Sequence, residues 1–313
     1  METRVPLPEV EVDVPLALPM EQRNLLEMHS IANIMSVIVT ELHLLQRDLG
    51  GAPAMEALID RACDLTHGLK RTEDRADTLR GMVALEEQIR GVSDAAVAAR
   101  PALGGTTGLR GSLDNLASVF SVLRLRVDEI LERMAGGDGW RDHDVGGLVE
   151  NVRGFLAAVE RNARGRYRIV TDPAEHDAGS YLVSLEVSGA GGPVVHMPPV
   201  VQDVFRDLVA NARKYTKPGG TIRAQLRDDG ASVHVVVEDD GRGIPQDQLT
   251  TVVAFGSRAR NVQPHETNGD GYGLTKVYDV VRRWGGRMWI ASAEGRGVRV
   301  TLRIPRPGPL TAV

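Results

Sequence analysis

Three short segments of this 313-residue chain have the residue types and spacing from which a chemical site can be built. In chain order they are residues 207–216 (DLVANARKYT), 238–245 (EDDGRGIP) and 269–275 (GDGYGLT). The first has the pattern of a helix, the second closes an apolar strand, and the third is a glycine-rich turn that opens a helix. We expect all three to meet around one pocket.

Two polar side chains in these segments suit different parts of a nucleotide. Asn211, on the predicted helix, offers an amide oxygen to a hard divalent cation that keeps several waters and bridges phosphate oxygens. Asp239, after the apolar strand, can accept a hydrogen bond from an exocyclic amine. Gly241 and Gly243 follow it and let a flat base lie against bare backbone. The segments therefore predict a magnesium ligand and an adenine-binding carboxylate.

The third segment suits phosphate. Gly269, Gly271 and Gly273 directly precede an apolar run that starts at Leu274, so backbone amides and a helix N-terminus would face the triphosphate. Taken singly, each glycine pattern is commonly a tight turn or a loop. Their order and spacing together predict a pocket for ATP and Mg²⁺.

Residues 142 to 305 resemble the ATP-binding domain of sensor histidine kinases, within the larger family that includes gyrase and the mismatch-repair ATPases. The resemblance implies that Lys214 reaches phosphate and that Tyr215 is the aromatic residue next to it. It also implies that Phe255 marks the start of a mobile lid over ATP, at about residues 256–270.

The region before this domain has helical periodicity. The first predicted helix, 21–49, carries an apolar heptad stripe formed by Met28, Ile31, Met35, Ile38, Leu42, Leu45 and Leu49. A second helix starts near Ala54 and is expected to run on, charged and exposed, to about Ala99. A third spans 111–134, with Leu113, Leu116, Phe120, Leu123, Val127, Ile130 and Met134 as its stripe. Stripes this broad predict a helical bundle.

A candidate phosphoryl acceptor lies on the first helix. With Met28 in the core, His29 is expected at the exposed rim of the bundle, with Asn33 one turn further on the same face. Residues 27–34 resemble the phosphoacceptor box of histidine kinases, where a His precedes an Asn or Thr by four residues. An ordinary exposed His is the alternative, and the rivals His43 and His67 lack that Asn.

Two positions depart from the family pattern. Ser30 follows His29, where family members usually carry an acid that orients the imidazole, whereas Asn33 matches the group that positions water for dephosphorylating a partner. This combination favours a regulated or phosphatase-biased enzyme. Asp207 stands where hydrolysing relatives have a Glu that acts as base, so slow ATP hydrolysis is expected.

Composition narrows the class of protein. The chain is 42% hydrophobic and 25% charged, which is typical of a globular domain, and we find no apolar run approaching 18 residues. We therefore expect a cytoplasmic protein without membrane insertion. The single Cys63 excludes an internal disulfide. A net charge of −5 argues against a nucleic-acid-binding surface.

The expected fold is α+β, with an N-terminal helical bundle followed by an α/β sandwich ATP-binding domain whose mixed sheet is covered by helices on one face. Prolines exclude a helix at the N-terminus, which leaves an extended arm, a short edge strand or a disordered tail. The expected parts are the arm (1–20), the dimerisation and phosphoacceptor bundle (21–135), a glycine hinge (136–141), the ATP-binding domain (142–306) and a tail (307–313).

The function these features favour is a soluble ATP-dependent protein histidine kinase that phosphorylates His29 and transfers phosphate to, or removes it from, a response regulator. We expect a homodimer, because three apolar stripes would bury more surface than one subunit's helices provide. Two alternatives remain open. One is an ATP-binding switch or scaffold without autokinase activity, and the other is a serine kinase of the anti-sigma type.

Overall fold

The computed structural model describes residues 6–51, 53–99, 107–262 and 271–307. The chain divides into two compact units, which we call the sheet unit (residues 1–17, 138–156 and 164–313) and the helical unit (18–137 and 157–163). The expected arm therefore clusters with the sheet and does not stand apart from it.

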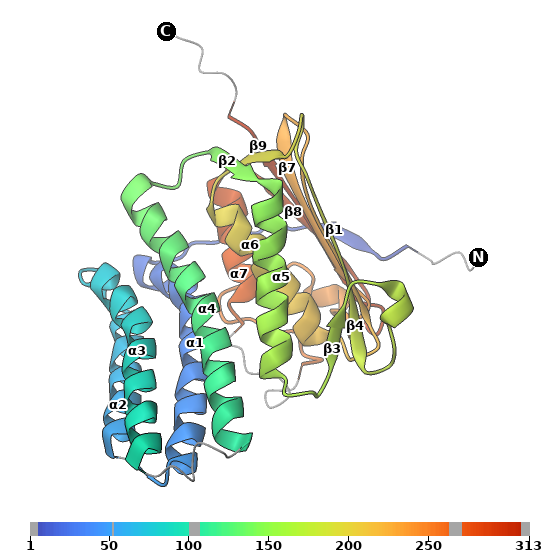
Figure 1. Cartoon of the computed structure of the whole chain (residues 1–313). Coiled ribbons are helices and arrows are strands. Elements are labelled where there is room, and N and C mark those ends of the chain that lie inside the picture. The colour runs from blue at the N-terminus through green and yellow to red at the C-terminus, as the bar shows by residue number, and fades with distance from the viewer. Residues whose placement is uncertain (1–5, 52, 100–106, 263–270, 308–313) are drawn as a thin grey trace. The chain divides into compact units, whose positions relative to one another are not determined.

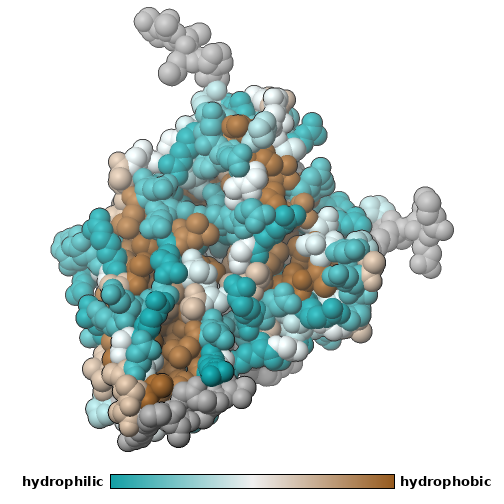
Figure 2. Space-filling view, viewed as in Figure 1, coloured by the Kyte–Doolittle hydropathy of each residue, from teal (hydrophilic) through white to brown (hydrophobic). Residues whose placement is uncertain are grey.

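The helical unit is a bundle closed by one chain. Its helices are α1 (Met20–Asp48), α2 (Pro53–Gly68), α3 (Arg75–Ala99) and α4 (Thr107–Gly136). Each contacts the next in sequence, and α1 also contacts α4, which completes a ring (Figure 1). The seven predicted stripe residues of α1 are all buried. On the face in Figure 2, hydrophobic side chains form stripes between hydrophilic ones.

The expectation of one long second helix is wrong. Helix α2 ends at Gly68 and α3 begins at Arg75, because the chain must turn back to bury a further apolar stripe. That stripe, on α3, is at most 3% exposed and consists of Leu79, Met82, Leu85 and Ile89. The polar residues 70–74 form the turn. Residues 75–99 are thus a full member of the bundle.

This fourth helix weakens the argument from three apolar stripes for a homodimer, and the homodimer itself stays a prediction. We expected three stripes that needed a second subunit, whereas α3 supplies the missing surface from the same chain. One predicted stripe residue of α4 does not join the core. Met134 is 50% exposed in the last turn of its helix.

Helix α1 is more apolar than we expected from the sequence, where we found no apolar run approaching 18 residues. An 18-residue window in it has a mean hydropathy of 1.3, so by length and composition α1 could cross a membrane, and 39% of that window is buried. The expectation that no apolar segment approaches 18 residues is therefore wrong. The core helix of a soluble protein passes the same test, and α1 supplies much of the bundle core.

The sheet unit confirms the expected α+β class. Its main sheet, in the described residues, has the strand order β1-β8-β9-β7-β6-β4-β3. The strands are β1 (Glu9–Glu11), β3 (Arg168–Val170), β4 (Ser180–Ser188), β6 (Thr221–Asp228), β7 (Ser232–Asp239), β8 (Arg287–Ser292) and β9 (Val298–Pro305). The pairs β3–β4 and β4–β6 are parallel and the others antiparallel, so the sheet is mixed.

Helices α5 (Val145–Asn162), α6 (Val200–Tyr215) and α7 (Gly273–Arg283) lie on one face of this sheet (Figure 1). Helix α6 packs on β6 and β7, and α7 packs on β8 and β9. Alternate residues of β7, namely Val233, Val235 and Val237, are buried. A separate two-stranded sheet pairs β2 (Arg141–Asp144) with β5 (Val194–Met197).

Of the three alternatives for the N-terminal arm, the structure shows the short edge strand. Strand β1 pairs antiparallel with β8, and Val12, just after it, is 3% exposed. The buried hydroxyl of Tyr278 on α7 accepts a hydrogen bond from the Val14 amide at 3.0 Å and donates one to the Val14 carbonyl at 2.8 Å. In chain order the helical unit is therefore an insertion between two strands of the sheet unit.

We predict that Tyr278→Phe destabilises the sheet unit by about 1–3 kcal/mol, because it leaves the amide and carbonyl of Val14 without this partner. Urea unfolding measures the loss, and hydrogen exchange of residues 8–16 should quicken. Tyr167→Phe is the matched control, because the Tyr167 hydroxyl bonds only the half-buried Arg213 side chain in the described contacts. Equal unfolding free energies and unchanged exchange in Tyr278→Phe would contradict the role of this hydroxyl.

Candidate nucleotide site

The three sequence segments meet in one pocket of the sheet unit. Its wall includes α6, the end of β7, residues 242–262 and the start of α7. The predicted residues that line it are Asn211, Tyr215, Asp239, Gly243, Gly271, Gly273 and Leu274. Apolar side chains from β7 and β9, among them Val237 and Val300, complete a wall on which a flat ring can lie.

Asn211 and Gly273 are held against each other. A Cβ atom on Gly273 would lie 2.6 Å from Nδ2 of Asn211 and 3.1 Å from its Oδ1, which is closer than a side chain tolerates. A side chain at position 273 therefore fits only if Asn211 moves. The side-chain amide of Asn211 on α6 thus lies directly beside the N-terminus of α7. The N-terminus of a helix attracts anions.

Asp239 is the buried carboxylate of the pocket. It is the last residue of β7 and is 9% exposed, and its Oδ1 accepts a hydrogen bond from the Gly241 amide at 2.9 Å. Burial raises the pKa of Asp239 to about 7, against the lowering effect of the Gly241 and Val298 amides. Gly241 itself does not line the pocket. A Cβ there would lie 2.5 Å from the Tyr215 carbonyl oxygen, so this turn also needs glycine.

The glycine turn is described from Gly271 onward, where φ is +77°, a left-handed conformation that favours glycine. Gly269 lies outside the described residues, as does much of the predicted lid. Phe255, at the predicted start of that lid, contacts Tyr272 with ring centroids 4.7 Å apart. This aromatic pair thus connects the residue just before the predicted lid with a residue just after it.

Two predicted residues are engaged elsewhere. Lys214 does not line the pocket, and its ammonium lies over the ring of Tyr215, 5.4 Å from the centroid. Asp207 also lies outside the lining, and its carboxylate pairs with Lys276 on α7 at 2.5 Å, where the lysine side chain is 7% exposed. The contact with Lys276 is made by one carboxylate oxygen of Asp207, Oδ2.

Sequence reasoning missed the cationic side chains of the wall. Arg242 and Arg258 both line the pocket, and Arg242 also donates to the Asn261 carbonyl at 3.2 Å. A signal was present for each, since Arg242 lies between the two motif glycines and Arg258 follows shortly after Phe255. No local pattern predicts the ion pair of Lys276, because its partner Asp207 is distant in sequence.

The residues of the pocket fit a hard divalent cation only together with a nucleotide. No group of three His, Cys, Asp or Glu side chains among the described residues could hold a metal ion. Asn211 offers a single amide oxygen, and Mg²⁺ commonly takes one or two protein ligands while phosphates and water supply the rest. The donor set thus suits Mg²⁺ carried by a triphosphate.

The candidate acceptor lies in the helical unit. Asn33 Nδ2 lies 3.0 Å from His29 Nε2 and can donate to it in the tautomer that carries the ring proton on Nδ1. Next to it, Ser30 Oγ accepts a hydrogen bond from Arg126 Nη2 at 2.8 Å. Arg126 is 4% exposed and also pairs with Glu129. The residue after His29 therefore faces a cation.

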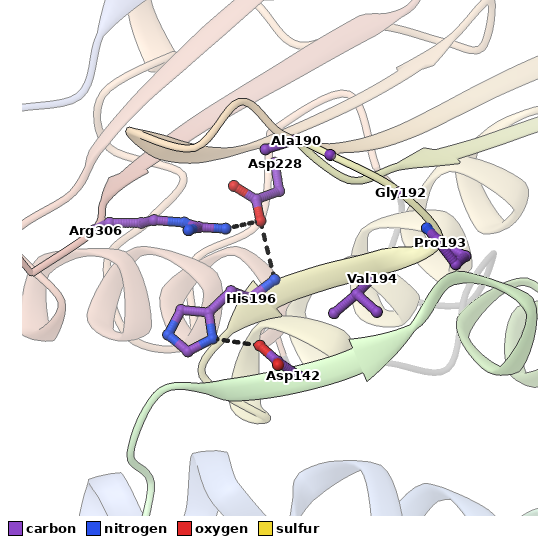
Figure 3. A pocket seen from close by; sticks show the side chains of 9 residues that line it. Asp142, Ala190, Gly192, Pro193, Val194, His196, Asp228 and Arg306 are labelled. Atoms are coloured by element: carbon purple, nitrogen blue, oxygen red, sulfur yellow. Dashed lines mark hydrogen bonds and ion pairs between the residues drawn. The ribbon is translucent and has the colours of Figure 1, made fainter.

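A second and larger cavity lies beside β2 and β5 and is shown in Figure 3. Its charged groups are already paired. Asp142 contacts His196 Nδ1 at 2.7 Å, and the buried Asp228 pairs with Arg306 and accepts from the His196 amide. None of the predicted site residues lines it, so size alone does not make it the candidate site.

Comparisons agree with the pocket formed by the three segments. Residues 197–308 match the family described as histidine kinase-, DNA gyrase B- and HSP90-like ATPases. The sensor-type histidine kinase PrrB of Mycobacterium leprae is 28% identical over 282 residues, which is 83% of this chain and 58% of PrrB. The adaptive-response sensory kinase SasA of Synechococcus elongatus is 36% identical over 109 residues, 34% of this chain and 28% of SasA.

A solved catalytic domain of the histidine kinase ThkA covers 53% of this chain and 97% of its own, at 19% identity and a TM-score of 0.39. This chain spans only part of the length of the two relatives named above, 58% of PrrB and 28% of SasA.

We predict that Asp239→Asn weakens ATP binding about tenfold or more and flattens its pH dependence. A charge-assisted hydrogen bond to the adenine amine is worth roughly 1.5–3 kcal/mol, and it needs the ionised carboxylate. With a pKa of about 7, Asp239 becomes protonated as pH falls, so affinity should drop toward about tenfold per pH unit below neutrality and level off above it. Calorimetric titrations from acid to mildly alkaline pH measure both effects.

Asp240→Asn is the control for this experiment. Asp240 carries the neighbouring carboxylate, which bonds the amide and hydroxyl of Thr221 at 2.9 and 2.8 Å and does not line the pocket. Because ATP itself titrates, the Asp239→Asn profile serves as the reference for all other ionisations. Parallel profiles for the parent and Asp239→Asn would remove Asp239 from the adenine site.

Proposed function

We propose that this chain, whose residues 197–308 belong to the histidine kinase-, DNA gyrase B- and HSP90-like ATPases, is an ATP-dependent protein histidine kinase. It would phosphorylate its own His29 and pass the phosphoryl group to an aspartate of a response regulator, or remove it from there. The observation that carries the proposal is the meeting of Asn211, Asp239 and Gly273 around one pocket, in a chain whose α1 bears His29 bonded to Asn33. The names of PrrB and SasA support it.

Each pocket residue has a distinct task in this proposal. Asp239 accepts from the adenine amine, and the amides at the start of α7 face the phosphates. Arg242 and Arg258 add positive charge to the same wall. Asn211 would hold Mg²⁺, which neutralises phosphate charge when bound. Catalysis by such a site is mostly positioning and electrostatic stabilisation.

The acceptor residues prepare the imidazole. In the tautomer with the ring proton on Nδ1, the Asn33 amide donates to the Nε2 lone pair, which must be released from the amide before it attacks phosphorus. Ser30 offers no carboxylate, and its hydroxyl is held by Arg126. A Glu placed at position 30 would find this guanidinium within reach, so it would not be a free base for His29. This arrangement supports a regulated enzyme, with phosphatase bias as part of the proposal.

An ATP-binding switch without autokinase activity is the second candidate. Two observations favour it. Ser30 stands where an acid would orient His29, and its hydroxyl accepts from Arg126. The Asp207 carboxylate, near Asn211, is paired with Lys276. The anti-sigma type of serine kinase is less favoured, because such proteins need little beyond the ATP-binding domain and this chain has a complete bundle.

Location and assembly belong to the proposal as well. A cytoplasmic protein without membrane insertion is supported by the part that α1 plays in the bundle core. A nucleic-acid partner is disfavoured by the net charge of −5. The homodimer expected from the sequence stays part of the proposal, although α3 weakens the argument from three stripes.

We predict that the chain becomes labelled by γ-labelled ATP and Mg²⁺, and that His29→Ala abolishes the label. The label should be acid-labile and base-stable, as expected of phosphohistidine. His43→Ala is the matched control, because His43 lies about four turns further along the same helix and should label like the parent. Label retained in His29→Ala would contradict the acceptor assignment. ATP binding without any label in the parent would make the nucleotide switch the better account.

A further inference from the structure

The N-terminal arm is fastened to the sheet unit by apolar packing and by charge. Its alternating apolar side chains lie in the core of the sheet unit or pack against it, and they are Val10, Val12, Val14 and Leu16. Between them, Glu11 forms an ion pair with Arg287, and Asp13 forms one with Arg282 at 3.0 Å. The arm is therefore docked through both faces of its strand.

One end of the arm is bonded to the helix that opens the nucleotide pocket. Both backbone groups of Val14 bond the hydroxyl of Tyr278, whose side chain is 1% exposed. Gly273 and Leu274, at the start of the same helix, line the pocket. Tyr278 follows Gly273 by five residues, which is about 7.5 Å along a helix axis. The arm thus holds α7 close to its pocket end.

The other end of the arm is bonded to a residue that fixes the turn after Asp239. The amide of Ser292, which is fully buried on β8, donates to the Pro8 carbonyl at 3.1 Å. The Ser292 hydroxyl accepts from the Ile244 amide at 2.8 Å and donates to the Gly297 carbonyl at 2.7 Å. Ile244 lines the nucleotide pocket. A second route therefore leads from the arm to the pocket wall.

We propose that docking of the arm and binding of ATP strengthen each other, so that the arm is a positioning element of the nucleotide site. The inference rests on the proposed function only in that the pocket binds ATP. ATP that contacts both the start of α7 and the turn at residues 241–244 favours the conformation in which both are fixed, and the docked arm favours the same conformation. Two binding events that favour one conformation are coupled, and the coupling is reciprocal.

The arm is a feature of this chain outside the matched ATPase region, because residues 197–308 are the ones that match the family. In chain order it continues through Pro19 into α1, which begins at Met20. The proposed coupling therefore gives α1 a covalent connection to a segment that sets the affinity for nucleotide.

Val12→Asp tests the effect of the arm on ATP. The substitution places a charge where the side chain is 3% exposed, at a position that does not line the pocket, so the arm should leave the sheet. We expect the affinity for ATP with Mg²⁺, measured by calorimetry, to fall by about fivefold or more. Ala17→Asp is the matched control, because it adds the same charge at an exposed position and should bind like the parent.

Glu11→Arg is a milder second variant, for which a melting curve should show an intact fold. It sets like charges of positions 11 and 287 against each other and should weaken ATP binding less than Val12→Asp does. Glu9→Arg is its control, because Glu9 is exposed on the same strand and has no ion pair among the described contacts.

Hydrogen exchange in the parent tests the reverse direction, which a purely structural role of the arm would not affect. Saturating ATP with Mg²⁺ should slow exchange of residues 9–14 by a factor similar to the loss of affinity in Val12→Asp. Strand β3, at the opposite edge of the sheet, is the internal reference and should not change. Unchanged exchange of residues 9–14 in a parent that binds ATP would overturn the coupling and leave the ATP site intact. A parent that binds no ATP would overturn both.

Discussion

The nucleotide pocket depends on one close approach, between the side chain of Asn211 on α6 and the backbone of Gly273 at the start of α7. No side chain fits at position 273 while Asn211 keeps its place, since its amide nitrogen lies 2.6 Å from where a Cβ would be. This contact brings the amide oxygen that we propose as a Mg²⁺ ligand, a helix N-terminus and the glycine turn to one point. Asp239 and the apolar wall of β7 and β9 then need only to define where the base lies.

Helix α7 has 11 residues, too few to be stable alone, so its position must come from its neighbours. Three contacts along it provide this. Gly273 lies against Asn211, Lys276 pairs with Asp207 of α6, and the Tyr278 hydroxyl bonds both backbone groups of Val14 in the N-terminal arm. Asp207 thus also anchors α7, and its role as a base stays a prediction. The arm that fixes α7 also leads into α1, the helix that carries His29.

Local patterns in the sequence were enough to find the parts that are built locally. The stripe of α1, the strand that ends in Asp239 and the glycine turn each have their signal within a few residues. What failed depended on contacts between distant residues. The break between α2 and α3 is decided by the burial of Leu79 and Met82 against other helices, and the edge strand β1 by its pairing with β8, almost 280 residues later. Ion pairs such as Lys276 with Asp207 have no local signature.

The central claim is that the contact between Asn211 and Gly273 creates the site for Mg²⁺ and ATP, and Gly273→Ala tests it most directly. The added methyl group meets the end of a flexible side chain, so the fold should persist while Asn211 is displaced. Gly154→Ala on α5, where a Cβ would meet nothing within 4 Å, is the matched control. Calorimetric titration with ATP, with and without Mg²⁺, should give parent-like affinity for Gly154→Ala. For Gly273→Ala we predict an unchanged unfolding midpoint, an affinity lower by about tenfold or more, and no gain from Mg²⁺. A Gly273→Ala protein that binds Mg²⁺ and ATP as tightly as the parent would contradict the account.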